Sequence, residues 1–426
     1  MTDPAEQIGY ASTTEPPINT KDSFTVSGWV LLKDGSKTRV VASAPGSASS
    51  AAFNLFYSAS AKKWVFNKAV ADSTAPAYVS ALAEASAPPL NVWTHLTGVF
   101  DTKSDTDKSN DTIQLFVNGR PQGTPVTLAV ANPSYTPWTS SAGMTVGASK
   151  AGEYFLGGID ELAVWQRALT RDDIRTEHQL QDDAGNPATE LVAYWDAAAA
   201  AGGKIADPTP YAPDMTLSGS GTVSDTQLGE LRFDGETGYA SATGPVIDET
   251  GSFTVTASVR LDGAKFSALP IGAKAHVFGQ ATPDGKESSW ALWAEKVSAD
   301  GYLWRFGRTA TDSTGAVLAT SSVPSKEPAS TDTWVQVTGV FDATAETDSG
   351  FGRTSLFVGA VKQPPGTDAA FTTAQQGKGE IAAGRGPAGG RQGNHLPGAV
   401  QEMRVWAGAM TWDQVSSKVN GEPGPE

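Results

Sequence analysis

Apolar and polar residues alternate through many short segments of the chain. The run 23–28 alternates in this way, and so do the runs 53–57 and 290–292. Clusters of Gly, Pro, Asn, Asp and Ser separate these runs. A period of two over a few residues, bounded by turn residues, predicts half-buried β-strands. The pattern therefore predicts many short antiparallel strands packed as a sandwich.

One stretch combines a strand with a helix start. The run 157–165 is strand-like and ends in Val164 and Trp165. Thr170 and Asp173 follow at the spacing of a capping box, with Asp at the position where Glu or Gln is usual. The same arrangement returns in residues 398–415, where the corresponding residues are Trp406, Thr411 and Gln414.

Other segments also occur twice and in the same order. Residues 9–30 match 238–259, residues 93–106 match 334–347, and residues 113–119 match 354–360. The conserved order indicates an internal duplication. Each copy has about 200 residues, enough for a core of its own.

The two copies begin at different points of the repeat. The second copy has an additional opening in residues 191–240, which includes the strand-like segment LRFDG at 231–235. The first copy begins only at the GYA of this opening, at residues 9–11. We therefore expect a first domain in residues 1–180 that lacks its first strand and has an unpaired sheet edge. Residues 181–190 are the expected linker, and residues 191–426 the second domain.

Composition and charge exclude several classes of function. The formal net charge is -15, which argues against nucleic acid because phosphate binding needs a positive face. Without cysteine, the chain has no disulfides, thiol catalysis or thiolate metal sites. No apolar run reaches the ~18–20 residues of a membrane span, so we expect no membrane insertion.

Four motifs together resemble a known family. They are SFTVSGWV (23–30), W-x-x-x-T-G-V-F-D (93–101), LFVNG (115–119) and GGIDELAVW-x-R-A-L-T (157–170). This set resembles the LamG-like (laminin G-like) members of the concanavalin A-like lectin/glucanase superfamily. The resemblance implies an all-β fold of two tandem concanavalin A-like jelly-roll β-sandwiches, each ending in a short helix. The Ala, Thr and Gly-rich composition also resembles secreted multidomain proteins of actinobacteria.

Catalytic signatures are missing from the sequence. Glucanases of the superfamily resemble one another in an E-x-D-x-x-E strand, whose alternate carboxylates share one face. No such triplet occurs here, and the adjacent Asp160 and Glu161 should point to opposite faces. We therefore expect no enzyme but a non-catalytic extracellular binding module, with glycan as the leading ligand. The alternatives are a structural, spacer or protein-interaction module that binds a surface protein, and an accessory region of a glycoside hydrolase.

The resemblance also implies where the chain acts and which metal it uses. We expect a secreted or cell-surface location, as part of a larger polypeptide whose signal peptide is not in this chain. In the LamG-like family a structural calcium ion often uses the Asp of the I-D-E motif and groups near the F-D-G strand. These positions are Asp160 in the first copy and Asp234 in the second, where Gln401 replaces the motif's Asp. Possible Ca²⁺ binding is thus assigned to Asp160 and Asp234.

The candidate ligand-binding residues lie in the first copy. Trp138 and Tyr135 sit in the Pro and Ser-rich segment 132–140, and an aromatic pair on a loop can stack on a sugar or anchor a protein. The alternative is a Trp138 side chain folded over the edge of the sandwich. Asn118, in the Asn-Gly turn of LFVNG, is the third candidate, and LFVGA in the second copy suggests that this turn is lost there. We expect binding mainly at the loops of the first copy, with the second copy as a scaffold.

Overall fold

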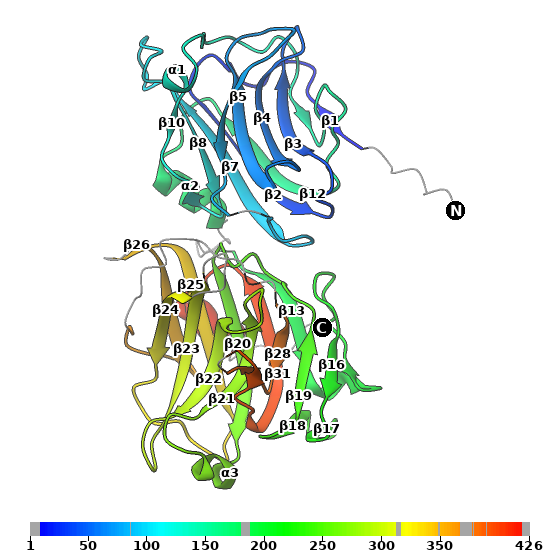
Figure 1. The fold of residues 1–426 in the computed structure, drawn as a ribbon, viewed down its shortest axis with the longest axis vertical. Helices are drawn as coiled ribbons and strands as arrows, with labels where there is room; N and C mark the ends of the chain where they lie inside the picture. Colours follow the sequence, from blue (N-terminus) through cyan, green and yellow to red (C-terminus); the bar gives the residue numbers. More distant parts are fainter. Residues whose placement is uncertain are drawn as a thin grey trace. The chain divides into compact units, whose positions relative to one another are not determined.

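A computed structural model describes residues 9–85, 87–179, 188–311, 317–347, 350–366, 377, 379–388 and 390–419 (Figure 1). The chain divides into two compact units, Met1–Gln179 and Leu180–Glu426. Most of the predicted linker 181–190 lies outside the described residues, and Glu190 already begins a strand of the second unit.

The first unit is built from two antiparallel sheets. One sheet has the order β1 (Ala11–Ser12), β11 (Thr145–Val146), β3 (Arg39–Pro45), β4 (Ala51–Ser58), β5 (Lys63–Ala69) and β6 (Tyr78–Leu82). The other has the order β10 (Val126–Thr127), β8 (Thr112–Val117), β7 (Trp93–Asp101), β2 (Phe24–Leu32) and β12 (Gly157–Trp165), with β9 (Arg120–Pro121) beside β8. The helices of this unit are α1 (Leu128–Ala131) and α2 (Arg171–Gln179).

The second unit repeats the two-sheet plan with more strands. Its first sheet has the order β17 (Thr222–Asp225), β18 (Glu230–Asp234), β31 (Pro397–Ala407), β20 (Phe253–Leu261), β25 (Val335–Thr347), β26 (Gly350–Val358) and β27 (Val361–Lys362), and β13 (Glu190–Asp196) also pairs with β31. Its second has the order β14 (Ala200–Ala201), β15 (Lys204–Ile205), β16 (Met215–Ser218), β19 (Tyr239–Ala242), β28 (Ile381–Ala383), β21 (Lys274–Ala281), β22 (Ser288–Lys296), β23 (Tyr302–Thr311) and β24 (Val317–Pro324).

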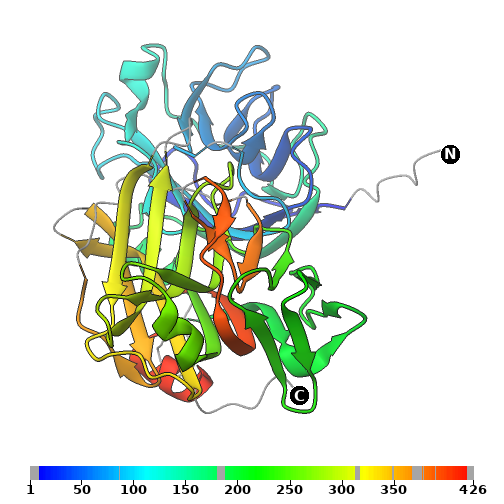
Figure 2. The ribbon, with the colours of Figure 1, turned by 60° about the horizontal axis from the view of Figure 1, so that its bottom comes forward.

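Short elements complete the second unit. The strands β29 (Gly386–Pro387) and β30 (Gln392–Gly393) form a small hairpin. The helices are α3 (Gly263–Ala268), α4 (Trp412–Gln414), a 3-10 turn at Ala197–Ala199 and a π-helical turn at Val415–Val419. Figures 1 and 2 show the strands of each unit stacked in two layers. The prediction of an all-β fold with two tandem jelly rolls is therefore confirmed.

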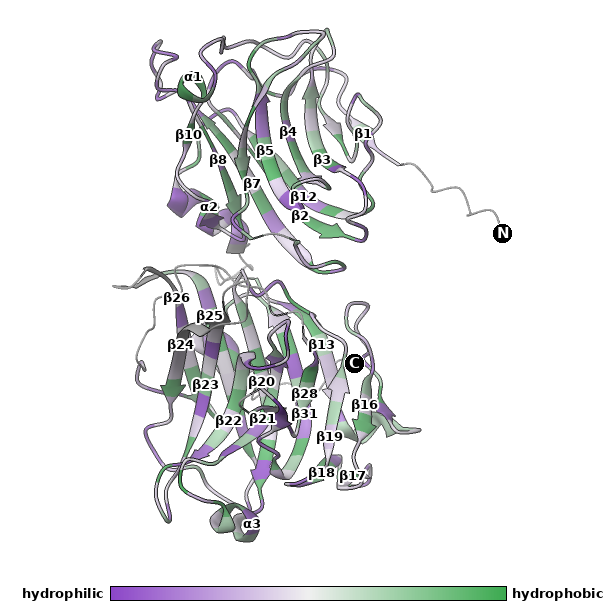
Figure 3. Ribbon diagram, viewed as in Figure 1, coloured by the Kyte–Doolittle hydropathy of each residue, from purple (hydrophilic) through white to green (hydrophobic). Residues whose placement is uncertain are grey.

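Equivalent aromatic rings fill the two cores. Phe24 of β2 packs on Phe100 of β7 with ring centroids 5.5 Å apart, and their counterparts Phe253 and Phe341 lie 5.6 Å apart. All four side chains are at most 1% exposed. The alternation of apolar and polar positions along the strands, visible in Figure 3, turns these rings inward. The duplicated sequence thus preserves one core arrangement in both units.

The T-G-V-F motif has a packing role in each unit. A Cβ atom on Gly98 of β7 would overlap the ring of Phe66, which lies on the facing β5. Gly339 of β25 stands in the same relation to Phe306 of β23. Glycine at this position therefore allows an aromatic ring of one sheet to lie directly on the backbone of the other.

We expect Gly98→Ala to lower the free energy of unfolding of the first unit by about 1–3 kcal/mol, because the added methyl group overpacks the core against Phe66. Gly9→Ala is the matched control, since nothing lies within 4 Å of a Cβ atom built there. Urea unfolding of both variants measures the effect. Equal stabilities of the two variants would contradict the packing role of Gly98.

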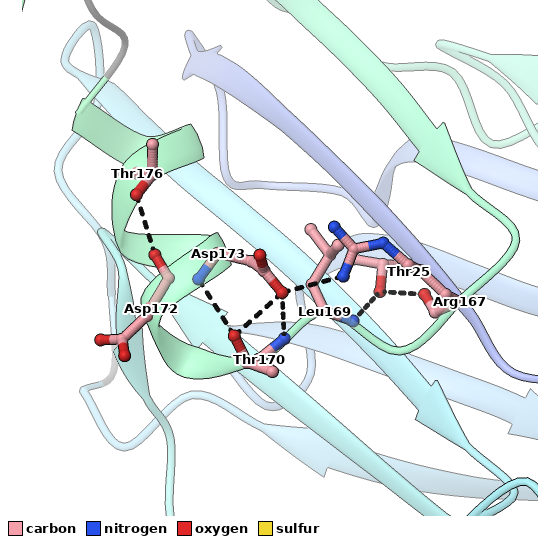
Figure 4. Close-up of polar contacts among 7 residues, drawn as sticks. All are labelled: Thr25, Arg167, Leu169, Thr170, Asp172, Asp173 and Thr176. Atoms are coloured by element: carbon pink, nitrogen blue, oxygen red, sulfur yellow. Dashed lines mark hydrogen bonds and ion pairs between the residues drawn. The ribbon is translucent and has the colours of Figure 1, made fainter. Parts of the chain in front are cut away.

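The predicted capping box opens α2 (Figure 4). The Thr170 hydroxyl accepts a hydrogen bond from the Asp173 N–H at 3.2 Å, and the Asp173 carboxylate accepts one from the Thr170 N–H at 2.9 Å. Asp173 also pairs with Arg167 at 2.9 Å. The hydrogen bond from Arg167 and those from Thr170 hold the pKa of Asp173 at about 2. The aspartate at this position thus completes the box.

A threonine of β2 fixes the turn between the last strand and the helix. Thr25 donates to the Arg167 carbonyl at 2.9 Å and accepts from the Leu169 N–H at 3.0 Å (Figure 4). Its counterpart Thr254 donates to the Gly408 carbonyl at 2.9 Å and accepts from the Met410 N–H at 3.0 Å. The capping box of Thr411 and Gln414 is also formed. The same two hydrogen bonds thus hold the turn between the last strand and the helix in both units.

None of the described helices is long and apolar enough to cross a membrane. The longest of them, α2, is strongly hydrophilic, as its colour in Figure 3 shows.

Candidate functional site

A groove lies on the outer face of the second unit, over β21, β22 and β23. It encloses about 370 Å³. Strand alternation decides which side chains reach it. Along β22, the buried Trp290 and Leu292 face the core, so Ala291, Trp293 and Glu295 face the groove. A groove of this size can hold a small ligand or a few rings of a larger one.

The neighbouring strand β23 follows the same rule. Trp304 and Phe306 enter the core, and Arg305 and Gly307 line the groove. The register places Arg305 directly opposite Trp293. The floor of the groove is therefore formed by side chains that project from two paired strands of a rigid sheet.

Trp293 forms an aromatic surface in this floor. A Cβ atom on Gly307 would lie 2.9 Å from the indole ring, so the ring extends over a position without a side chain. The Lys274 ammonium lies 5.4 Å from the ring centroid, and Trp293 is half-buried. The Arg305 guanidinium and the Glu295 carboxylate form an ion pair beside the ring. The indole is thus flanked by charged groups that can donate and accept hydrogen bonds.

His276 lies deeper in the groove. It is 4% exposed, its backbone N–H donates to the Asn394 carbonyl at 2.8 Å, and a Cβ atom on Gly386 would overlap its ring. Burial lowers the pKa of His276 to about 4, and a hydrogen bond with the Ala382 backbone opposes this only in part. The imidazole is therefore neutral at physiological pH and acts as a polar group without charge.

The groove combines one aromatic ring with a mixed-charge rim. Such a surface suits a ligand that has one apolar face and several hydroxyl groups. Within the described residues, no group of three or more His, Cys, Asp or Glu side chains could hold a metal ion. The residues of the groove can stack on a ligand and exchange hydrogen bonds with it.

The aromatic pair predicted in the first unit does not form a common surface. Tyr135 is fully buried, and its hydroxyl donates to the Asp111 carboxylate at 3.0 Å. Burial, followed by the negative charge of Asp111, raises the pKa of Tyr135 above its ordinary range. The expectation that Tyr135 presents its ring on a loop surface is wrong, because the residue is part of the core.

Trp138 packs over the edge of the sandwich. Its indole N–H donates to the Ala69 carbonyl at 3.2 Å, and its half-buried ring rests on the hydrophobic core. A Cβ atom on Gly46 would lie 2.8 Å from the ring. These contacts favour the packing interpretation of Trp138 over that of a ligand platform.

Asn118 serves the backbone of its turn. Asn118 has φ 51° and Gly119 φ 74°, which form the tight turn between β8 and β9. The side chain is 2% exposed, and its oxygen accepts from the His95 N–H at 2.9 Å. This burial leaves Asn118 no access to a ligand, in contrast to the sequence-based expectation.

The corresponding turn persists in the second unit. Gly359, at the position of Asn118, has φ 58° and joins β26 to β27. Its N–H donates to the Gln336 carbonyl at 2.8 Å, as the Asn118 N–H does to the His95 carbonyl. The prediction that this turn is lost is wrong, since glycine adopts the left-handed conformation without strain.

Asp160 and Glu161 lie in a β-bulge rather than in regular strand. The register between β12 and β2 shifts between Asp160 and Ala163, and Glu161 has φ 52°. Both carboxylates are exposed. The expected projection to opposite faces therefore does not hold, because a bulge interrupts the alternation.

The residues proposed for calcium serve local structure. Asp160 accepts a hydrogen bond from the Glu161 N–H at 2.8 Å. Asp234 accepts from the N–H groups of Glu236, Thr237 and Gly238 at 2.8–2.9 Å and from the Thr237 hydroxyl at 2.8 Å. Burial raises the pKa of Asp234, but these bonds outweigh it and lower the pKa below its ordinary value. Calcium needs six to eight oxygen ligands. The described donor set does not fit, so calcium stays an unsupported prediction.

The sequence contains a signal for the groove in the alternation of residues 290–293. Trp290 and Leu292 alternate with Ala291 and Trp293, so a strand that turns Trp290 and Leu292 toward the core turns Trp293 outward. Arg305, next to the core residue Trp304, could be placed in the same way. What the sequence could not supply was the pairing that sets Arg305 opposite Trp293.

Known proteins resemble the chain only at low sequence identity. A search of curated proteins found no match. Among solved structures, mouse laminin alpha1 domains LG4-5 are 11% identical, with 94% of this chain and 86% of that chain covered and a TM-score of 0.30. Domain 4 of AbnA, an extracellular arabinanase of Geobacillus stearothermophilus solved with arabinotriose, is 16% identical, with coverages of 54% and 97% and a TM-score of 0.37. Similarity at this level assigns neither ligand nor activity.

A pentraxin from Limulus polyphemus is similar to the chain at 17% identity, with coverages of 41% and 77% and a TM-score of 0.31. The family model described as the concanavalin A-like lectin/glucanases superfamily matches residues 6–175 and again residues 234–416. These two matches, one for each sandwich, span well over half of the sequence. The chain therefore belongs to the concanavalin A-like lectin/glucanases superfamily and carries two tandem LamG-like domains.

Proposed function

We propose that the protein is a non-catalytic carbohydrate-binding module and that its ligand contacts lie in the groove over β21, β22 and β23. It acts as part of a larger secreted or cell-surface polypeptide. The observation that carries the proposal is Trp293, a half-buried indole with the Lys274 ammonium 5.4 Å from its centroid and the Arg305–Glu295 ion pair beside it.

Sugar chemistry accounts for this combination. The C–H face of a pyranose or furanose ring is apolar and packs against an aromatic ring, and its hydroxyl groups both donate and accept hydrogen bonds. Glu295 accepts, and Lys274 and Arg305 donate. A protein ligand would need a broader apolar contact surface than the single indole that the groove presents. The geometry therefore favours a glycan over a surface protein.

The donor set of the groove favours binding over hydrolysis. Glycoside cleavage commonly uses two carboxyl groups that flank the scissile bond, one of which must reach the glycosidic oxygen. Glu295 is engaged in an ion pair with the Arg305 guanidinium. This pairing fixes the carboxylate beside the indole, where it can accept hydrogen bonds from ligand hydroxyl groups.

We expect the full chain to bind a restricted set of glycans on an array and to release no reducing sugar from them. Array fluorescence and a reducing-sugar assay at pH 5, 6 and 7 measure the two properties on the same preparation. Release of sugar by the pure protein would identify an enzyme. Absence of binding to every glycan would favour an interaction or spacer module and would refute the proposal.

A further inference from the structure

The two units differ along one sheet edge. In the second unit, β31 pairs with β20 on one side and with both β13 and β18 on the other. In the first unit, the equivalent strand β12 pairs with β2 and ends the sheet within the described residues (Figure 1). No strand in the described part of the chain pairs with the outer edge of β12, so its backbone N–H and C=O groups there are available to an added strand.

Burial of the equivalent side chains shows what this difference exposes. Val400, Met403 and Val405 of β31 are fully buried. Their counterparts Ile159, Leu162 and Val164 of β12 are only partly buried, although they pack against the core of the first unit. The core of the first unit is thus only partly covered beside the outer edge of β12.

The second unit also shows which kinds of side chain cover such an edge. Trp195 of β13 and Leu231 of β18 are fully buried in the core, and Phe233 is 4% exposed. Trp195 lies opposite Met403, whose counterpart is Leu162, and Leu231 lies opposite Val400, whose counterpart is Ile159. An apolar strand with one bulky aromatic residue would therefore cover the half-buried side chains around Leu162 of β12.

We propose that the outer edge of β12 binds an extended polypeptide segment by strand addition, and that this segment has the pattern of β13, ELVAYWD, with aromatic and apolar residues at the core-facing positions. Main-chain hydrogen bonds would provide the pairing, and the side chain at the Trp195 position would close the core beside Leu162. The proposal is independent of the glycan groove, which belongs to the other unit.

The test uses the full chain and a labelled peptide with the sequence of residues 188–198, ATELVAYWDAA. Fluorescence anisotropy should show saturable binding that weakens at least about tenfold for the same peptide carrying Trp195→Ser, since the loss of a core-filling aromatic anchor removes much of the binding energy. Hydrogen exchange should slow in β12 when the peptide is added, while β2, which is paired on both sides, serves as the internal reference.

A variant of the chain adds a second check. Leu162→Lys places a charge beside the outer edge of β12 and should abolish binding of the peptide. Thermal melting confirms that the variant remains folded. If this variant unfolds, hydrogen exchange of the unaltered chain with and without the peptide still tests the proposal.

Three outcomes would overturn the proposal. The first is that the peptide does not bind, or protects β31 instead of β12. The second is that β12 exchanges as slowly as β2 in the free chain, which would mean that residues of the chain itself cover the edge. The third is a concentration-dependent dimer with protection of β12, which would identify a second copy as the occupant.

Discussion

Replacement of Trp293 by alanine is expected to weaken glycan binding by about 5- to 150-fold, with little change in the melting temperature. The estimate takes about 1–3 kcal/mol for the lost stacking surface, by analogy with bases stacked on aromatic side chains. The ring lies on the outer face of β22, over Gly307, and is separate from the core formed by Trp290 and Leu292. Isothermal titration with the best glycan from the array measures the affinity.

Trp138→Ala is the matched control for this experiment. Trp138 is also half-buried, but its indole N–H is bonded to the Ala69 carbonyl and its ring rests on the core of the first unit. Its removal should therefore lower the unfolding free energy by at least about 1 kcal/mol and leave glycan affinity unchanged. If Trp138→Ala weakened binding and Trp293→Ala did not, the ligand site would lie at the loops of the first unit instead.

The fold could be predicted from the sequence because its signals are local and repeated. Period-two alternation marks individual strands, and the duplication indicates that the same order of strands is used twice. The capping box was also predictable, since Thr170 and Asp173 are only three residues apart. Strand pairing and the burial of loop side chains were not predictable, because they depend on residues far apart in the sequence.

The candidate site shows this difference directly. Tyr135 was expected on the surface because its segment is rich in Pro and Ser, but Asp111 supplies a partner for its hydroxyl inside the fold. Composition identifies a loop and does not tell which of its side chains turn inward. Trp293, by contrast, could be assigned from alternation alone. Its role became visible only when β22 and β23 were seen paired, with Arg305 opposite the indole.

Both cores contain a buried basic side chain at equivalent positions. Lys68 of β5 lies 4.2 Å from the ring centroid of Phe100, and Arg308 of β23 lies 4.2 Å from that of Phe341. Arg308 additionally forms an ion pair with the fully buried Glu249 at 3.4 Å. Sequence alternation predicts an inward position for both residues, as for Trp64 and Trp304 earlier in the same strands. A charge buried in a core, such as that of Arg308, is costly unless it is compensated.

The environment of Glu249 makes this compensation dependent on pH. Burial raises the pKa of Glu249 to about 7, and the Arg308 cation and a hydrogen bond from the Ser289 hydroxyl oppose the increase. The carboxyl therefore binds a proton more readily in the folded chain than in the unfolded one, where its ordinary value is 4.5. Its contribution to stability is greatest below pH 4.5 and is lost as the pH rises through about 7.

Arg308→Met is therefore expected to destabilise the second unit far more at pH 8 than at pH 5. At pH 8 the variant must either bury the Glu249 carboxylate without the Arg308 cation or keep Glu249 protonated against the pH, and breaking a buried ion pair costs about 3–5 kcal/mol. At pH 5 Glu249 is protonated with or without Arg308, so mainly the contacts with Phe253 and Phe341 are lost. Urea unfolding at pH 5, 6, 7 and 8, compared with the unaltered chain, measures the difference. In a chain that carries Glu249→Gln, Arg308→Met should cost about the same at all four pH values, because the amide cannot ionise. An equal cost of Arg308→Met at all four pH values would show that Glu249 does not titrate in the folded protein over this range.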